Sequence, residues 1–296
     1  MSILVTGATG FVGGALVRRL AQMRQEVHAV VRPQSNVDSL ANLEGVKIHR
    51  HDGTTKDLCG ILNAAAPETV LHLASMFRAD HEPSDLDPLI RTNVLFSAQV
   101  AEAAVRAGVR RLVNAGTAWQ HYCDADYDPV CLYAAAKQAC ESILEYYARA
   151  CGLYVITLIL SDTYGPGDSR PKLFSLLRNA ATRGERLSMS PGEQKLDLVY
   201  IDDVVEAFLQ AAVRLRTERV EVPQRYAVRT GRALSLREIV ARYRDAGGAT
   251  PVIDWGNRPY RSREVMSPWS GGTTLPGWHA AVALEEGLRR MVAHNV

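Results

Sequence analysis

Short apolar runs alternate with longer segments of helical apolar spacing over residues 1–165. The apolar runs predict buried strands at residues 3–6, 27–31, 46–49, 70–73, 112–115 and 154–160. Segments 11–23, 88–107 and 132–150 repeat apolar residues three and four apart, which predicts helices, and Gly108 follows the second of them where a helix would end. Strands that alternate with helices of this length predict an α/β fold with a parallel sheet covered on both faces.

The pattern loosens after residue 161. A turn cluster at residues 165–168 precedes predicted helices at 172–182 and 204–214, a strand at 196–200 and a final helix at 280–294. Segment 251–278 contains four of the 13 prolines and three of the four tryptophans, and shows no clear period. We therefore expect two domains. Residues 1–165, with 195–230 returning to them, form the first, and the smaller second one consists of residues 166–194 and 231–296.

Composition and charge narrow the class of protein. The 296 residues are 47% hydrophobic and 22% charged, with 34 basic against 32 acidic side chains, so the polycationic surface of a nucleic-acid-binding protein is not expected. We expect no membrane span, because no apolar run reaches about 18 residues. The N-terminus has no basic segment of a secretory signal, which favours a cytoplasmic protein. Five cysteines without a CxxC pair favour reduced thiols over a disulfide framework or a metal site.

Three glycines follow the first predicted strand at G-x-x-G-x-x-G spacing. Gly7, Gly10 and Gly13 lie between strand 3–6 and the helix that starts near residue 11. Glycines there let the backbone turn tightly and lie against a pyrophosphate, while the helix N-terminus offers free N–H groups to the anion. Glycines also serve ordinary turns, but this context predicts a dinucleotide site on a Rossmann-like, doubly wound parallel sheet.

The second predicted strand ends at Arg32, nineteen residues after Gly13. NAD-preferring sites place an acidic residue at this point, whereas a guanidinium pairs with the 2′-phosphate of NADP. We therefore expect NADP(H), with NAD(H) still possible and a solvated arginine as the alternative for Arg32. Asp52, after the third strand, is a candidate acceptor for the adenine amino group, and a turn-forming aspartate is the alternative.

Tyr133 and Lys137 open the long helix 132–150. Side chains four apart share a helix face, so that the phenol and the ammonium can meet one ligand. An exposed tyrosine beside an exposed lysine is the alternative. Thr117, sixteen residues before Tyr133, ends the preceding predicted strand.

With these residues the sequence resembles the extended short-chain dehydrogenases/reductases of the sugar-nucleotide epimerase/dehydratase family. The resemblance runs nearly end to end. The matching positions are 6–13 (TGATGFVG), Asp52, 71–75 (LHLAS), 92–94 (TNV), Thr117, Tyr133 with Lys137, 164–168 (YGPGD), 199–204 (VYIDDV) and 275–278 (LPGW). Residues 117–122 and 275–278 look most like the branch of CDP-abequose-type deoxysugar 4-ketoreductases.

The resemblance implies a role for each matched residue. Tyr133 would exchange a proton with the substrate oxygen, Lys137 would lower the pKa of Tyr133 and hold the nicotinamide ribose, and Thr117 would orient the same oxygen. Asn93 would support the site, with a capping role as the alternative, and His72 is expected to be a satisfied buried histidine. Further cofactor contacts are implied for Gly7, Thr9, Gly10, Phe11, Val12, Asp52, Gly53, Leu73, Ala74 and Ser75. A homodimer formed through helices 93–107 and 132–150 is also implied, with burial in the monomer as the alternative.

Within the family, three reactions compete. Dehydratases carry an Asp-Glu pair after the active-site Thr, and here Ala118 and Trp119 follow Thr117. Epimerases retain NAD through the cycle, which Arg32 disfavours. A 4-ketoreductase that consumes NADPH suits Arg32 and is the function we expect, on a nucleotide-linked 4-keto-6-deoxyhexose. A non-catalytic dinucleotide sensor is a further alternative, although such proteins usually lose the Tyr/Lys pair.

One position departs from the family pattern. Family members commonly have Asn before the Tyr-Gly-Pro turn, where its amide contacts the nucleotide phosphates, and this chain has Asp162. A carboxylate repels a diphosphate, so Asp162 either points away or holds the substrate differently. Lys172, Arg178 and Arg261 are candidate phosphate partners or solvated charges. Trp119 and the other tryptophans are candidates for a sugar-binding face or for packing. Asp202 and Asp203 are expected as N-cap and first-turn acids.

Overall fold

The computed structural model describes residues 2–218, 220 and 222–294. Residues 1, 219, 221, 295 and 296, which fall within the predicted domain ranges, lie outside the described residues.

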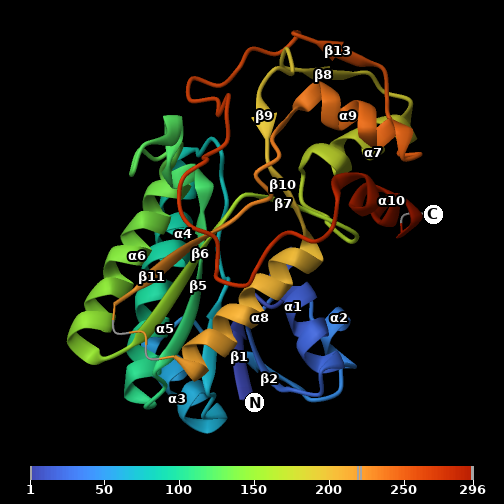
Figure 1. Cartoon of the computed structure of the whole chain (residues 1–296). Coiled ribbons are helices and arrows are strands. Elements are labelled where there is room, and N and C mark those ends of the chain that lie inside the picture. The colour runs from blue at the N-terminus through green and yellow to red at the C-terminus, as the bar shows by residue number, and fades with distance from the viewer. Residues whose placement is uncertain (1, 219, 221, 295–296) are drawn as a thin grey trace.

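A seven-stranded sheet, entirely parallel, forms the centre of the molecule (Figure 1). Its strands lie in the order β11-β6-β5-β4-β1-β2-β3. They are β1 (Ser2–Thr6), β2 (Glu26–Val31), β3 (Val46–Arg50), β4 (Thr69–His72), β5 (Arg111–Thr117), β6 (Tyr154–Leu160) and β11 (Gln224–Val228). The predicted fold class is confirmed, and six of these strands were predicted. The chain runs from β1 to β2 and β3 on one side and then returns to β4 on the other side of β1, so the crevice of a doubly wound sheet opens beyond the carboxyl ends of β1 and β4.

Helices cover both faces of the sheet, as the alternation along β1 requires. Ile3 and Val5 pack with α1 (Phe11–Gln22) and α8 (Ile201–Thr217), whereas Leu4 packs with the helices on the opposite face. Those opposite helices are α3 (Thr55–Ala65), α5 (Phe96–Arg106) and α6 (Leu132–Cys151). Figure 1 shows the two helical layers on either side of the sheet. The predicted helix 88–107 is divided in two, because a π-helical turn, Arg91–Leu95, separates α4 (Leu86–Ile90) from α5.

Smaller elements gather above one end of the sheet (Figure 1). They comprise α7 (Leu173–Arg183), α9 (Leu236–Asp245), α10 (Leu284–His294) and three two-stranded sheets, β10–β7, β12–β9 and β13–β8. These short strands are β7 (Asp162–Tyr164), β8 (Leu187–Met189), β9 (Lys195–Leu196), β10 (Leu198–Tyr200), β12 (Leu234–Ser235) and β13 (Ile253–Trp255). The predicted strand 196–200 is divided at Asp197, whose buried carboxylate accepts hydrogen bonds from the backbone N–H groups of Thr230 and Gly231.

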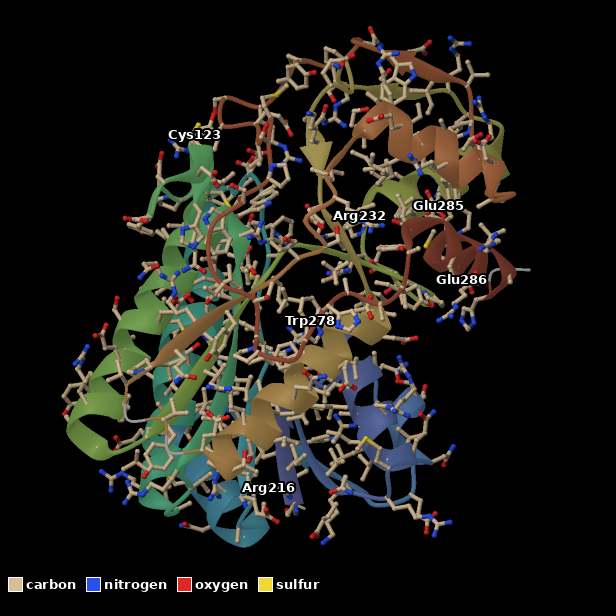
Figure 2. The ribbon with its side chains drawn as sticks, in the orientation of Figure 1. Cys123, Arg216, Arg232, Trp278, Glu285 and Glu286 are labelled. Carbon is tan, nitrogen blue, oxygen red and sulfur yellow. The ribbon has the colours of Figure 1, made fainter. Side chains whose placement is uncertain are left out.

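Asp203 and Trp278 tie the C-terminal segment to α8. Tyr200 is the N-cap of α8, so the predicted capping role of Asp202 is wrong, and both aspartates lie in the first turn. The Asp203 carboxylate accepts hydrogen bonds from the backbone N–H groups of residues 281 and 282, and its carbonyl accepts one from the Trp278 indole (2.9 Å). These bonds tie residues 281 and 282 to α8, and both lie outside any helix, so that α10 starts at Leu284 rather than at residue 280. Figure 2 shows Trp278 against α8.

Four short helices complete the described elements: α2 (Asp38–Ala41) and three 3₁₀ turns, at Pro83–Asp85 between β4 and α4 and at Ala118–Gln120 and Tyr122–Asp124 between β5 and α6. All five cysteines are free thiols. Among the residues described, no helix combines the length and the apolar character that crossing a bilayer demands.

Candidate active site

The glycine loop approaches neighbouring backbone so closely that side chains are excluded. Gly7 has φ +71°, and a Cβ there would lie 2.7 Å from the backbone nitrogen of Ala74, in the segment that follows β4. A Cβ on Gly13 would overlap the carbonyl oxygen of Gly7. Gly10 caps α1 without a side-chain hydrogen bond, so the N-terminus of α1 faces the crevice as bare backbone. This cradle fits the pyrophosphate of a dinucleotide, with Thr9 exposed and Phe11 and Val12 half-buried at its rim.

A chain of hydrogen bonds fixes the segment after β4. The backbone N–H groups of Leu73 and Ala74 donate to the Thr6 hydroxyl, which contacts His72 Nδ1 at 2.8 Å. His72 Nε2 lies 2.9 Å from the Ser97 hydroxyl, and this hydroxyl donates to the carbonyl of Asn93. Because Ser97 donates there, it must accept from His72, which gives a neutral imidazole protonated at Nε2. Burial lowers the pKa of His72 to about 3, so this is the satisfied buried histidine that was predicted.

Asn93 holds the next residues of the same segment. Its side-chain carbonyl accepts hydrogen bonds from the Ser75 hydroxyl (2.9 Å) and the Met76 N–H (3.1 Å), and its amide donates to the Met76 carbonyl (2.9 Å). Asn93 is fully buried and lies in the π-helical turn rather than at a helix cap. Asn93 thereby sets the position of Ser75, and Ser75 in turn hydrogen-bonds Tyr133.

The other end of the crevice contains Arg32, Asp52 and Gly53. Arg32 follows β2, is exposed and forms no ion pair with any described residue. Asp52 accepts a hydrogen bond from the Thr54 N–H (2.7 Å), so it forms the turn that we considered as an alternative, and this bond lowers its pKa. Gly53 has φ +97°, and its carbonyl accepts a hydrogen bond from Gln99. The arginine is thus placed at the β2 end, where a ribose phosphate would lie.

Asp52 also belongs to the one group of potential metal ligands found among the described residues, with His51 and Asp57. The His51 imidazole and the Asp52 N–H both contact the Asp57 carboxylate (2.8 and 3.1 Å). These contacts account for the cluster as a local hydrogen-bonded turn, and we assign it no metal.

Thr117, Tyr133 and Ser75 meet where β5, α6 and the segment after β4 converge. Burial raises the pKa of Tyr133 to about 12, while side-chain hydrogen bonds with Ser75 and Thr117 lower it. Thr117 Oγ1 accepts a hydrogen bond from the Trp119 N–H, so its hydroxyl proton is free to point toward the phenol. The tyrosine is therefore a neutral proton donor at neutral pH.

Lys137 lies one turn after Tyr133 on α6 and is 2% exposed. Its ammonium forms no ion pair with the described residues, and burial lowers its pKa. The cation that acts most on Tyr133 is Arg170 rather than the expected Lys137. A buried, unpaired ammonium next to the glycine crevice suits the ribose hydroxyls of a bound dinucleotide.

Phe77, which was not singled out in the sequence, joins the predicted substrate residues into one cluster. Its ring packs edge to face against Trp119 (centroids 5.3 Å apart), and the ammonium of Lys172 lies 5.9 Å from its centroid. Lys172 forms an ion pair with Asp162 (3.1 Å). The sequence left open how a carboxylate at position 162 could lie near a substrate diphosphate. The ion pair resolves this, because Lys172 neutralises the negative charge of Asp162.

Arg261 lies on the far side of the cluster, with its guanidinium 5.7 Å from the Trp119 ring centroid. Arg178 is not brought to the site, because it faces the buried Tyr243 between α7 and α9. Of the other tryptophans, Trp278 is buried, and Trp255 packs under Arg237 in the small β13–β8 sheet. Trp119 alone of the four contacts this cluster.

Arg170 is a second residue that the sequence did not reveal. Its guanidinium forms two hydrogen bonds with the Asp168 carboxylate, both 2.7 Å, and lies 4.6 Å above the centroid of the Phe11 ring. It thus fastens the turn at residues 165–168 over the start of α1, and brings a cation between the glycine loop and Tyr133. Arg170 and Phe11 are 159 positions apart in the sequence. No local sequence pattern could therefore predict that they are in contact.

Comparisons with known proteins agree with this geometry. The sequence profile described as the NAD dependent epimerase/dehydratase family matches residues 3–227. The chain is 29% identical to CDP-abequose synthase of Yersinia pseudotuberculosis over 90% of this chain and 92% of that protein. It is also 29% identical to UDP-glucose 4-epimerase of Mycolicibacterium smegmatis, over 99% and 97%. The solved structure of UDP-glucose 4-epimerase from Thermotoga maritima with UDP-glucose superposes with a TM-score of 0.86 at 25% identity, over 100% and 98% of the two chains.

Proposed function

The chain belongs to the NAD dependent epimerase/dehydratase family, and on that premise we propose that it is an NADPH-dependent ketoreductase acting on the 4-keto group of a nucleotide-linked 4-keto-6-deoxyhexose. Residues 1–165 and 195–230 hold the cofactor, and residues 166–194 and 231–296 complete the substrate site. We further propose a cytoplasmic homodimer, for which the exposed Leu86, Leu95 and Tyr146 on α4 to α6 supply apolar surface.

The chemistry required of the chain is the delivery of one proton. A bound nicotinamide supplies the hydride that adds to the carbonyl carbon as the C=O π bond breaks. Tyr133 then gives its phenolic proton to the developing alkoxide, which leaves a secondary alcohol. Its raised pKa keeps that proton in place until charge develops on the substrate oxygen. Thr117 and Ser75 orient the phenol and the oxygen, and the guanidinium of Arg170 favours the tyrosinate that remains.

The exposed Arg32 is the main reason to propose a reductase rather than an epimerase. It is exposed and unpaired with any described residue at the end of β2, where a 2′-phosphate would lie. A reductase releases its oxidised cofactor at every turnover and draws on NADPH, whereas an epimerase retains its cofactor through the cycle. The chain lacks the Asp-Glu pair that serves dehydratases as acid and base, because Ala118 and Trp119 follow Thr117. The likeness to CDP-abequose synthase supports the same reading.

A nucleotide-sugar 4-epimerase is the second candidate, favoured by the likeness to UDP-glucose 4-epimerases over nearly the whole chain. Both candidates use the same Thr117, Tyr133 and Lys137, so the site geometry alone suits either reaction. A dinucleotide sensor without catalysis has no need of a proton donor joined to two hydroxyls, and the described site contains one.

The purified protein, NADPH or NADH and an enzymatically prepared nucleotide-linked 4-keto-6-deoxyglucose provide the test, followed at 340 nm with product analysis. We expect stoichiometric oxidation of NADPH and a new deoxysugar. Interconversion of nucleotide sugars without a net change in absorbance would instead identify the epimerase. The proposed function would be overturned if the protein neither reduced the keto sugar nor interconverted nucleotide sugars.

A further inference from the structure

A buried hydrogen-bond network begins at Thr117 and leads away from the reaction site. The backbone N–H of Thr117 donates to the side-chain oxygen of Gln120 (3.0 Å), and Gln120 is 0% exposed. The amide nitrogen of Gln120 donates to Glu141 (2.7 Å) and to Gln138 (2.9 Å), both on α6. Because both amide hydrogens are used, the oxygen of Gln120 has only one orientation, toward Thr117.

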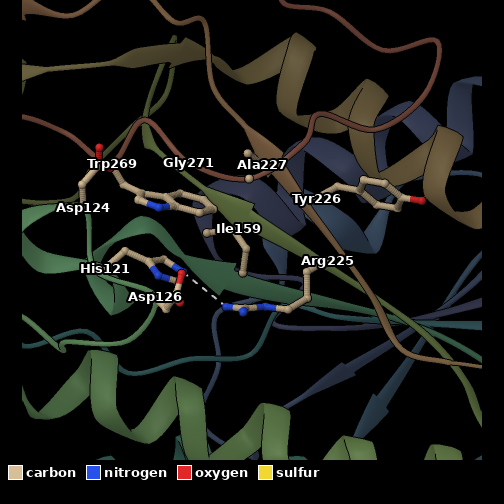
Figure 3. Close-up of a pocket in the computed structure, with 10 residues that line it drawn as sticks. His121, Asp124, Asp126, Ile159, Arg225, Tyr226, Ala227, Trp269 and Gly271 are labelled. Atoms are coloured by element: carbon tan, nitrogen blue, oxygen red, sulfur yellow. Dashed lines mark hydrogen bonds between the residues drawn. The ribbon is translucent and has the colours of Figure 1, made fainter.

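Glu141 is the buried charge at the centre of this network. Its side chain is 8% exposed, and its second carboxylate oxygen pairs with Arg225 Nε (2.9 Å) from the edge strand β11. Arg225 also contacts His121 Nε2 (3.2 Å), and the His121 ring stacks on Trp269 with centroids 4.1 Å apart. Figure 3 shows His121, Arg225 and Trp269 on the wall of a cavity of about 300 Å³. Arg225 is 43% exposed, so its charge remains hydrated while Glu141 stays paired and fixed.

Glu141 also lies one helical turn after Lys137, on the same side of α6. The ammonium of Lys137 has no ion pair among the residues described, and the titratable groups that act on it are His72 from β4 and Cys140 and Glu141 from α6. His72 is neutral, and burial raises the pKa of the Cys140 thiol. Cys140 and Glu141 both raise the pKa of Lys137, and because burial keeps the Cys140 thiol neutral, Glu141 is the group that brings a negative charge.

We propose that Glu141 is a positioning residue for both sides of the reaction site: through Gln120 it fixes the backbone and hydroxyl of Thr117, and through its charge it keeps Lys137 an ammonium. Neither Gln120 nor Glu141 touches the substrate. The kinetic part of this inference rests on the proposed function, whereas the titration of Lys137 does not.

Two variants separate the two effects. Glu141→Gln keeps the shape and an acceptor for Gln120 but removes the charge, and Gln120→Met keeps the volume but removes every hydrogen bond of the amide. Glu145→Gln is the matched control, because Glu145 lies one turn further along α6 in an exposed ion pair with Arg149. Circular dichroism and thermal unfolding establish that each variant is folded.

The first readout is the pKa of Lys137, measured by NMR of ¹⁵N-labelled lysine side chains. The chain contains only five lysines, and the Lys137 signal is assigned by its loss in Lys137→Arg. We expect Glu141→Gln to lower the pKa of Lys137, while Glu145→Gln leaves it unchanged. An unchanged Lys137 titration in Glu141→Gln overturns the electrostatic half of the proposal, whether or not the protein reduces keto sugars.

The second readout is turnover. We expect Gln120→Met to lower kcat about tenfold or more with KM for NADPH within about twofold, because a misplaced orienting group costs rate rather than cofactor affinity. We also expect the alkaline limb of the pH profile of Glu141→Gln to move to lower pH. Wild-type kcat in a folded Gln120→Met variant overturns the positioning half. An inactive wild type together with a shifted Lys137 titration rejects the proposed reduction and retains the electrostatic effect of Glu141 on Lys137.

Discussion

The Phe77 ring meets the Tyr133 ring edge to face, with centroids 5.1 Å apart and ring planes at 82°. Phe77 is 43% exposed, although it is a large apolar side chain packed against the half-buried Tyr133. The ring therefore separates the proposed proton donor from solvent on one side, and offers its other surface to Trp119 and Lys172.

Replacing Phe77 tests whether this ring forms part of the sugar site. We expect Phe77→Ala to lower kcat/KM for the keto sugar about fivefold, since an aromatic contact of this kind contributes about 1 kcal/mol. The affinity for NADPH, measured by fluorescence titration, should remain within about twofold. Phe77→Tyr retains the ring and should keep most of the activity. Equal losses in both variants, or a loss confined to NADPH affinity, would contradict a sugar-binding role.

Under the proposed function, we expect Arg32 to determine the choice between the two nicotinamide cofactors. We expect Arg32→Ser to weaken NADPH binding about tenfold to a hundredfold, because it removes a charge-assisted pair with the 2′-phosphate, and to leave NADH binding nearly unchanged. Arg91→Gln, which removes an exposed arginine from the surface of the π-helical turn, serves as the control. Parallel effects on the two cofactors would mean that Arg32 is a solvated charge.

Tyr133→Phe separates an enzyme from a binding protein. We expect turnover to fall about a thousandfold because the proton donor is lost, while NADPH affinity changes little. Tyr127→Phe, at an exposed tyrosine, is the matched control. Steady-state rates at 340 nm and calorimetric binding give the two readouts. A variant that retains wild-type turnover would remove Tyr133 from the reaction.

Acid should destabilise the fold through its buried histidines. The folded-state pKa of His72 is about 3, against 6.5 for an ordinary histidine, so the stabilising effect of the neutral imidazole is fully present above pH 6.5 and is lost as the pH falls below it. At pH 5 the loss from His72 is about 2 kcal/mol. His28 and His49 contribute in the same direction, because burial lowers the pKa of each.

Urea unfolding between pH 8 and pH 5 measures this effect. His72→Asn should show a smaller decline in the free energy of unfolding over that range, whatever its stability at pH 8. The carboxyl groups with altered pKa values titrate mostly below this window, so they do not mask the slope. A slope equal to that of the wild type would mean that His72 is protonated in the folded protein.

How far the sequence predicts the structure depends on whether a feature is local. The strand β6 was predicted with its exact bounds, since seven mostly apolar residues leave little choice. The edge strand β11 was missed because it contains Gln224 and Arg225, whose side chains reach Arg214 and Glu141 rather than a core. Helix α9 was also missed, although Ser235 and Glu238 form a capping box that could have located its start.

The same distinction applies to the site. The glycine loop and the Tyr133–Lys137 pair are spacings within one segment, so sequence reasoning finds them. Phe77, Arg170 and Glu141 gain their place from tertiary contacts, and each resembles an ordinary surface or helix residue in the sequence. The sequence shows that position 162 is an aspartate, but only the structure shows that its charge is neutralised by an ion pair with Lys172.

The π-helical turn at Arg91–Leu95 places Asn93 against the segment after β4, so the candidate active site depends on this turn. The turn inserts one residue into a helix, closed by the hydrogen bond from the Phe96 N–H to the Arg91 carbonyl. A deletion of one residue within it would restore ordinary α-helical spacing and leave the flanking α4 and α5 in phase, because a π-turn absorbs its extra residue locally. Asn93 would then swing away from Ser75 and Met76, while α5 kept its own packing. A lineage could thus abandon catalysis through a single codon loss and retain a stable dinucleotide-binding scaffold.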